Sequence, residues 1–138
     1  AFNRCEHCKP IPGEEVIGFK ETDGSISIHK RNCPDAISLA SQYGDSIVSV
    51  DYHEEENVLY PVSIHVKAID RYHLLSDIID CITNKLGLSI DSLHTVTVDF
   101  IVDCTIQFAI HSFEELQSIT SHLYHIEGVE EVYNEDLQ

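Results

Sequence analysis

The chain has 138 residues, 43% of them hydrophobic, and a formal net charge of −16. Its length allows one domain of ordinary size or two small ones with thin cores, and its acidity disfavours autonomous nucleic-acid binding, because negative charge repels the phosphate backbone. No apolar run approaches the roughly 20 residues of a membrane-spanning helix, and neither an initiator Met nor a signal segment begins the chain, so we expect a soluble, cytoplasmic piece of a longer protein without membrane contact.

A hairpin is predicted near the start of the chain. Residues 15–20 and 25–30 are short β-prone runs, and Thr22-Asp23-Gly24 between them is typical of a tight turn. The first module therefore begins with two antiparallel strands.

A helix and a third strand should follow the hairpin. Cys33 and Pro34 stand where an N-cap and a first-turn proline are expected, and Gly44 should end the helix. Residues 47–52 then look like a strand. The first module, residues 1–52, is therefore predicted to have the order ββαβ.

The polar run His53–Asn57 marks the module boundary. A hard-metal site is conceivable there, but charge runs usually stay in water, so we predict a solvated linker at residues 53–59. The second module, residues 60–138, is the acidic one, because residues 53–138 carry −13 of the net charge of −16.

The second module should begin with a strand and a helix. Alternation predicts a strand with one buried face at Val62, Ile64, Val66 and Ala68. Spacings of three and four residues predict one apolar helix face at Leu74, Leu75, Ile78, Ile79, Ile82 and Leu86. Gly87 supplies a C-terminal cap.

Two strands, a second helix and a last strand complete the second module. One strand face should hold Leu88, Ile90, Val96 and Val98, and that of the next strand Val102, Cys104, Ile106, Phe108 and Ile110. A turn near Asp99-Phe100 joins them. The capping box Ser112–Glu115 opens a helix that ends at Gly128, and residues 129–133 are β-prone. The order βαββαβ predicts a ferredoxin-like α+β fold with both helices on one sheet face.

Four side chains of the first module have the spacing of a zinc site: Cys5, Cys8, His29 and Cys33. Tetrahedral zinc takes four N or S ligands, with the early pair two to four residues apart. Such a closed site is structural, and it would supply folding free energy to a module with little apolar area. Two alternatives stay open: thiols that pack or face solvent, and a redox pair at Cys5 and Cys8.

The other sequence features carry less chemistry. Five cysteines without a secretion signal indicate a reducing compartment, and we expect Cys81 and Cys104 to be small core residues. We find no Gly-rich phosphate loop, no G-x-S-x-G and no H-E-x-x-H motif.

One loop of the second module is a candidate site for a small anionic ligand, such as the carboxylate of an amino acid. It contains Asp70, Arg71, Tyr72, His73 and Leu74, between the first strand and the first helix. Helix N-termini present free N–H groups to anions. The alternative is an ordinary connection in which Asp70 caps the helix.

Both modules resemble a known family along nearly the whole chain. The first resembles the conserved-cysteine (zinc-finger) domain of long RelA/SpoT homologues, through the run from Cys8 to Phe19, Gly24, Ile28-His29 and Cys33-Pro34-Asp35. The second resembles the ACT domain that ends those proteins, through Tyr60-Pro61-Val62, Asp70-Arg71 and the run from Leu74 to Ile78.

The chain departs from the family pattern at two places. The family usually has adjacent cysteines shortly before Pro-x-Pro-Gly, and here those positions are His7 and Cys8, with a further cysteine at Cys5. Cys5 and His7 are therefore alternative fourth ligands. A glycine commonly precedes the paired leucines of the ACT loop, and here that residue is His73.

The resemblance implies a regulatory role. In such (p)ppGpp synthetase/hydrolases the catalytic domains lie N-terminal to this region, and the C-terminal modules sense starvation through ribosome and tRNA contacts, ligand binding or self-association. The fragment would have no activity of its own. Contacts with the catalytic domains of the same chain and a homodimer through the edges of the ACT sheet are expected. The alternatives are a free-standing amino-acid sensor or metal-binding adaptor, and a small thiol oxidoreductase.

Overall fold

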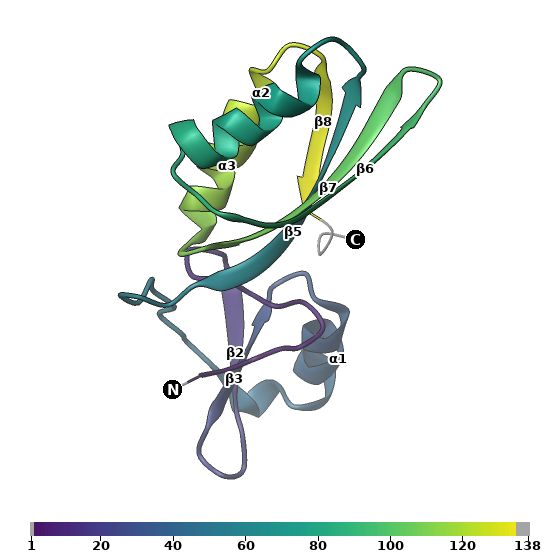
Figure 1. Ribbon diagram of the computed structural model, residues 1–138. Helices are drawn as coiled ribbons and strands as arrows, with labels where there is room; N and C mark the ends of the chain where they lie inside the picture. Colours follow the sequence, from purple (N-terminus) through teal and green to yellow (C-terminus); the bar gives the residue numbers. More distant parts are fainter. Residues whose placement is uncertain (1, 135–138) are drawn as a thin grey trace. The chain divides into compact units, whose positions relative to one another are not determined.

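Two separate four-stranded sheets organise the chain, and each is the base of an α+β unit (Figure 1). The computed structural model describes residues 2–134. The two units span Ala1–Glu56 and Asn57–Gln138. None of the helices in residues 2–134 is long and apolar enough to cross a membrane.

The first unit contains four strands, one helix and a short 3-10 turn. They are β1 (Phe2–Arg4), β2 (Val16–Lys20), β3 (Ile26–Lys30), α1 (Pro34–Gln42), η1 (Gly44–Ser46) and β4 (Ile47–Val48). The strand order is β1-β3-β2-β4. The hairpin is confirmed: β2 and β3 pair antiparallel, with Val16 opposite Lys30.

The predicted order ββαβ missed β1 and made the last strand too long. β1 pairs parallel with β3, with Phe2 opposite Ile26. Three residues cannot show the alternation that marks a strand, so only the long-range pairing identifies β1. β4 ends at Val48 instead of Tyr52.

The core of the first unit is small and includes two cysteines. One cluster of buried residues consists of Cys8, Phe19, Cys33 and Ala36. Ile11 and Ile28 are also buried. A core of this size contributes little hydrophobic stabilisation, since that free energy scales with the apolar area removed from water.

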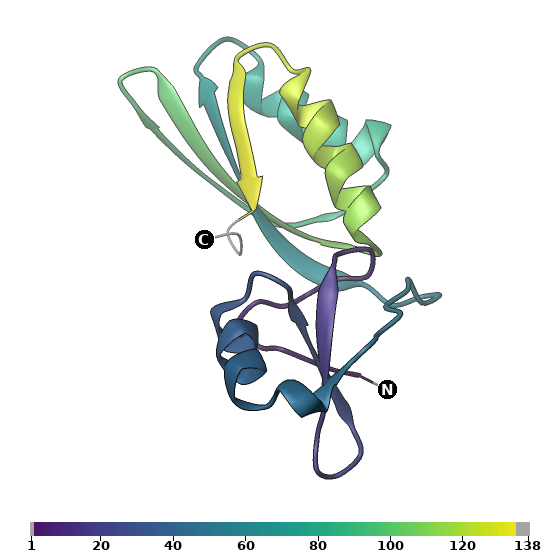
Figure 2. The same ribbon diagram turned by 180° about the vertical axis from the view of Figure 1, so that it is seen from behind.

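The second unit has the predicted βαββαβ order. Its elements are β5 (Tyr60–Ile69), α2 (Leu74–Asp80), the π-helical turn η2 (Cys81–Lys85), β6 (Ile90–Val98), β7 (Ile101–Ile110), α3 (Phe113–Tyr124) and β8 (Val129–Asn134). The antiparallel sheet has the order β6-β7-β5-β8. Both helices lie on one face of this sheet, as predicted (Figures 1 and 2).

The first helix of this unit is less regular than its apolar pattern suggests. The α-helix ends at Asp80, and the chain continues as η2, where the N–H of Leu86 donates to the carbonyl of Cys81. Gly87 follows with a φ of 68°, in the left-handed region that glycine tolerates best.

The predicted buried face of β6 is wrong. The pairing of β6 with β7 shifts between Ile90 and Ser92, so a β-bulge reverses the alternation that the pattern assumed. Leu93 lies opposite the buried Ile106, whereas Val98 is 62% exposed.

The second helix begins as predicted, but it ends at Tyr124 instead of Gly128. The Ser112 hydroxyl accepts a hydrogen bond from the N–H of Glu115 at the start of α3. The buried stripe consists of Leu116, Ile119 and Leu123. The turn predicted near Asp99-Phe100 is also present, and both residues have positive φ.

Candidate metal centre

Three elements of the first unit bring the four predicted ligands together. Cys5 follows β1, His29 belongs to β3, and Cys33 is the N-cap of α1. Cys8 lies in the loop before β2. The three Sγ atoms and one ring nitrogen of His29 all lie within 4.8 Å of one another. This cluster could hold a metal ion.

Two backbone hydrogen bonds fix the two ends of the Cys5–Cys8 turn. The N–H of Cys5 donates to the carbonyl of Ile28 at 2.9 Å and so extends the pairing of β1 with β3. The N–H of Lys30 donates to Sγ of Cys8 at 3.3 Å. Both thiols are therefore held against β3, the strand that carries His29.

The His29 ring fits a metal ligand. The residue is buried, and its Nδ1 has no hydrogen-bond partner among residues 2–134. Its ring packs edge-on against Phe19, with 5.6 Å between ring centroids. Because buried polar atoms are nearly always satisfied, a buried ring that has an unpaired nitrogen and lies beside three thiols fits a ligand position. Burial also lowers the pKa of His29, which favours the neutral imidazole that binds metals.

The thiols are arranged for a cation and poorly for redox chemistry. Burial raises the pKa of Cys8 to about 12, whereas reactive Cys-x-x-Cys thiols have lowered pKa values. Cys33 stands at the N-terminus of α1, whose positive dipole end favours a thiolate. Three sulfurs and one nitrogen form a donor set that suits zinc.

The structure separates the two candidates for the fourth place. Cys5 lies with all three other donors, whereas His7 groups with Cys33 and Asp35 only. The His7 Nδ1 is 3.3 Å from Oδ2 of Asp35, at the surface of the unit.

The loop of the five predicted ligand-binding residues, Asp70 to Leu74, is held mainly by hydrogen bonds within the second unit. Arg71 donates from Nε to the Glu127 carbonyl at 2.7 Å and from Nη2 to Asp77 at 2.8 Å. Leu74 is buried, and Tyr72 is 85% exposed.

The alternative prediction, in which Asp70 caps the helix, is wrong. His73 occupies the N-cap position with a φ of 65°, and its side chain makes no cap hydrogen bond. The N–H of Asp70 instead donates to the carbonyl of Phe100, at the tip of the β6–β7 hairpin. α2 itself has only seven residues.

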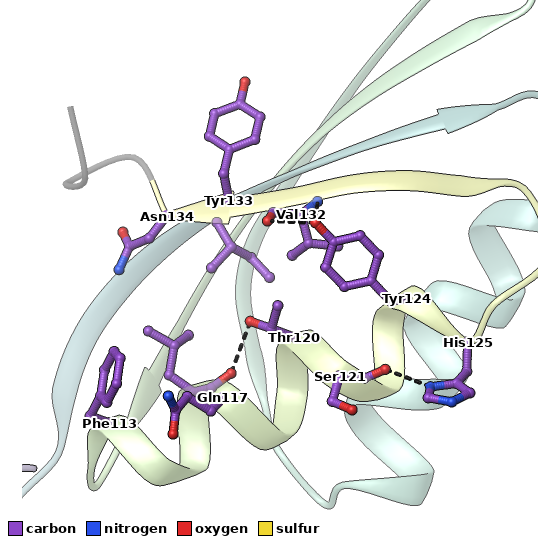
Figure 3. A pocket seen from close by; sticks show the side chains of 11 residues that line it. Phe113, Gln117, Thr120, Ser121, Tyr124, His125, Val132, Tyr133 and Asn134 are labelled. Atoms are coloured by element: carbon purple, nitrogen blue, oxygen red, sulfur yellow. Dashed lines mark hydrogen bonds between the residues drawn. The ribbon is translucent and has the colours of Figure 1, made fainter.

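Sequence reasoning missed a groove between α3 and β8 (Figure 3). It has a volume of about 530 Å³, and its lining includes Ile64, Leu116, Gln117, Tyr124 and Val132. No sequence motif predicts this groove, because its lining residues come from three separate elements. The Tyr124 hydroxyl lies at its rim, where it accepts from the N–H of Val132 at 2.9 Å and donates to the Val132 carbonyl.

Both units match known domain families. Residues 1–53 match the RelA/SpoT RIS domain, and residues 56–133 match the ACT domain. Among solved structures, the ACT domain from the GTP pyrophosphokinase of Chlorobium tepidum has a TM-score of 0.51 and 17% identity, and the match covers 56% of this chain and 99% of that one. That likeness supports the fold of the second unit.

Curated relatives extend the match to long proteins. The bifunctional (p)ppGpp synthase/hydrolase RelA of Mycobacterium tuberculosis is 28% identical over 126 residues, which cover 91% of this chain and 17% of that protein. The GTP pyrophosphokinase of Streptomyces antibioticus is 28% identical over 94% of this chain and 15% of its own length. The GTP pyrophosphokinase of Escherichia coli K12 is 35% identical over 59% of this chain and 11% of its own length. The chain therefore spans about one sixth of the first two relatives.

Proposed function

Since the chain belongs to the ACT domain family and has a RelA/SpoT RIS domain ahead of its ACT domain, we propose that it is the C-terminal regulatory region of a bifunctional (p)ppGpp synthetase/hydrolase. One observation carries the proposal: the two matches stand in series and together span residues 1–133. A free-standing amino-acid sensor or adaptor would explain the ACT match alone.

The region has no turnover of its own in this proposal. It transmits starvation signals in the cytoplasm to catalytic domains that precede it in the parent chain. Contacts with the ribosome and tRNA arise only in the full-length protein, because the fragment itself is strongly acidic and repels phosphate backbones.

We propose that the cluster of Cys5, Cys8, His29 and Cys33 holds one structural zinc ion. The unpaired Nδ1 of His29 and the small core of the first unit support this assignment. Zinc bound there supplies charge neutralisation for the thiolates and folding free energy. With four protein ligands no coordination place is left for a catalytic water.

We also propose an amino-acid ligand for the loop of Asp70 to Leu74 in the same regulatory region. A carboxylate ligand would have to compete with Asp77 for Nη2 of Arg71. Isothermal titration with each of the 20 amino acids tests this proposal. Binding that is lost in Arg71→Gln supports it, and the absence of heat for all 20 contradicts it.

A homodimer through an edge of the ACT sheet is the other proposed contact, and β6 is the favoured edge. At β8 the Tyr124 hydroxyl already occupies the N–H and the carbonyl of Val132, so an added strand could not pair there. β8 also carries Glu130 and Glu131, whereas Asp91 is the only carboxylate of β6. Like charges therefore oppose self-pairing at β8 more than at β6.

The regulatory proposal is tested in two steps. The isolated chain should neither make nor hydrolyse (p)ppGpp, and turnover by the pure chain would contradict the proposal. The parent enzyme truncated before the residue that corresponds to Ala1 should retain catalysis but lose its normal balance between synthesis and hydrolysis. An unchanged balance under starvation signals would also contradict it.

A further inference from the structure

Five Cys and His side chains of the first unit lie around a proposed site that needs four ligands. Besides the four clustered ligands, His7 reaches the same edge of the cluster, because a ring nitrogen of His7, Sγ of Cys33 and a carboxylate oxygen of Asp35 lie within 4.8 Å of one another. Cys33 is thus shared by two groups of donors. The surplus donor is a feature that the zinc assignment alone does not explain.

The five donors divide by burial. Cys8, His29 and Cys33 are buried and line the interior of the cluster. Cys5 is half-buried, and the His7 side chain is 69% exposed. The site therefore has three interior donors and one open side, where Cys5 and His7 both lie.

The turn between the two anchors leaves His7 room to move. The N–H of Cys5 donates a hydrogen bond to the carbonyl of Ile28, and Sγ of Cys8 accepts one from the N–H of Lys30. A further bond closes the turn from the N–H of Lys9 to the Cys5 carbonyl at 2.9 Å. Glu6 and His7, between these anchors, are exposed, so a side-chain rotation of His7 displaces no core residue.

Asp35 contacts both surface donors. Its Oδ2 lies 3.3 Å from Nδ1 of His7 and 4.0 Å from Sγ of Cys5. Metal-bound histidines commonly donate their second ring N–H to a carboxylate, which orients the ring and raises its basicity. Asp35 already holds Nδ1 of His7 in this way, so Nε2 is the ring nitrogen left for a metal.

We propose that His7 is a spare ligand for the metal site. Cys5 is the fourth ligand in the intact protein, and His7 becomes the fourth ligand when residue 5 supplies no thiolate, as in Cys5→Ser. The three interior donors stay in place during this exchange. The site changes from three sulfurs and one nitrogen to two and two, and both sets are known for structural zinc. This inference depends on the proposed metal binding.

The test is a titration of the full 138-residue chain with Co²⁺, which reports thiolate ligands through sulfur-to-cobalt charge transfer. The wild type should bind one ion with three thiolates. Cys5→Ser should still bind one ion, with charge transfer reduced by about a third, because two of three thiolates remain. Cys5→Ser/His7→Ala should lose most of its affinity.

Two further variants separate His7 from a solvent ligand. His7→Ala alone should keep the wild-type spectrum, because Cys5 fills the fourth place. Asp35→Asn should weaken cobalt binding by about 10- to 100-fold in the Cys5→Ser background, as expected for loss of the carboxylate behind a ligating histidine, and much less in the wild type.

The outcomes that overturn the inference are distinct from failure of the zinc assignment. A Cys5→Ser chain that binds no cobalt, when the wild type binds one, shows that the site has no spare ligand. Equal affinities of Cys5→Ser and Cys5→Ser/His7→Ala show that His7 is not the replacement. A changed spectrum in His7→Ala alone shows that His7 is a ligand of the intact site. Only a wild type that binds no cobalt overturns the metal assignment as well.

Discussion

The backbone N–H of Lys30 donates a hydrogen bond to Sγ of Cys8 at 3.3 Å, within the small core of the first unit. The bond lowers the pKa of Cys8, but burial raises it further, and the net shift is upward, to about 12. A buried thiol with this pKa stays protonated at neutral pH unless a cation stabilises the thiolate. A metal ion would therefore supply the charge that the protein interior lacks at this point.

Removal of the metal should unfold the first unit and spare the second. Structural zinc supplies about 10–16 kcal/mol in zinc-finger peptides, which equals or exceeds the whole stability of a small domain. Amide spectra recorded after addition of a strong chelator should lose dispersion for residues 2–56 and keep it for residues 57–134. Cys33→Ser should behave like the chelated protein.

The control for this experiment is Cys104→Val, which removes a buried thiol outside the cluster and should leave the metal content at one per chain. A first unit that keeps its dispersed spectrum in the chelated, metal-free state would contradict the structural role of the ion.

Replacement of Cys104 should make the free energy of unfolding of the second unit less dependent on pH at high pH. Burial raises the pKa of Cys104 from 9.0 to about 11. The unfolded chain therefore releases this proton at lower pH than the folded chain, and stability present below pH 9.0 is lost as the pH rises through about 11. The pKa rises by about two units, so at about 1.4 kcal/mol per unit the full loss is on the order of 3 kcal/mol.

The measurement is the free energy of unfolding of the second unit in urea at several pH values, for the wild type and for Cys104→Val. The wild type should lose stability relative to Cys104→Val as the pH rises from 9 to 11, because only the wild type carries the buried thiol. Parallel curves would show that the thiol is not protected from ionisation in the folded state.

Tyr124→Phe should destabilise the second unit by about 1–2 kcal/mol, because two hydrogen bonds of roughly 0.5–1.5 kcal/mol each are lost at Val132. Urea unfolding measures the change. Tyr72→Phe is the matched control, since this ring is 85% exposed and should give no change. Equal stabilities of Tyr124→Phe and the wild type would mean that water replaces the hydroxyl at no cost.

A carboxylate on β6 should break the proposed dimer, and one on β8 should not. Val98→Asp places a charge on an exposed residue of β6 and should shift the chain to monomer in sedimentation velocity experiments. Tyr133→Asp places the same charge on β8 and should leave the dimer intact. If only Tyr133→Asp dissociates the dimer, the interface lies at β8. A monomeric wild type would contradict the proposed dimer.

The sequence predicted the second unit better than the first, and the reason is the range of the interactions involved. Alternation from Val62 to Ala68 and the capping box at Ser112 are local signals, and both led to the correct elements. β1 is defined only by its pairing with β3, more than 20 residues away, as shown by Phe2 opposite Ile26. The bulge after Ile90 was also invisible, because it changes the register without changing the residue types.

The candidate metal centre shows the same division. Spacing alone identified Cys5, Cys8, His29 and Cys33 as a possible ligand set, and the structure brings these four together. The choice between Cys5 and His7 depends on which side of the turn faces β3. The sequence alone does not show this orientation. The roles of Arg71 and Tyr124 likewise depend on carbonyls contributed by distant elements, at Glu127 and Val132.

The most direct experiment joins the metal site to regulation in the full-length parent enzyme. The Cys33→Ser substitution removes a proposed ligand without touching the catalytic domains. Both (p)ppGpp synthesis and hydrolysis are measured with and without starvation signals, together with zinc content. We expect loss of zinc and a changed balance between the two activities, with catalysis itself retained. Loss of zinc and unfolding of the first unit with an unchanged, fully responsive balance would contradict it.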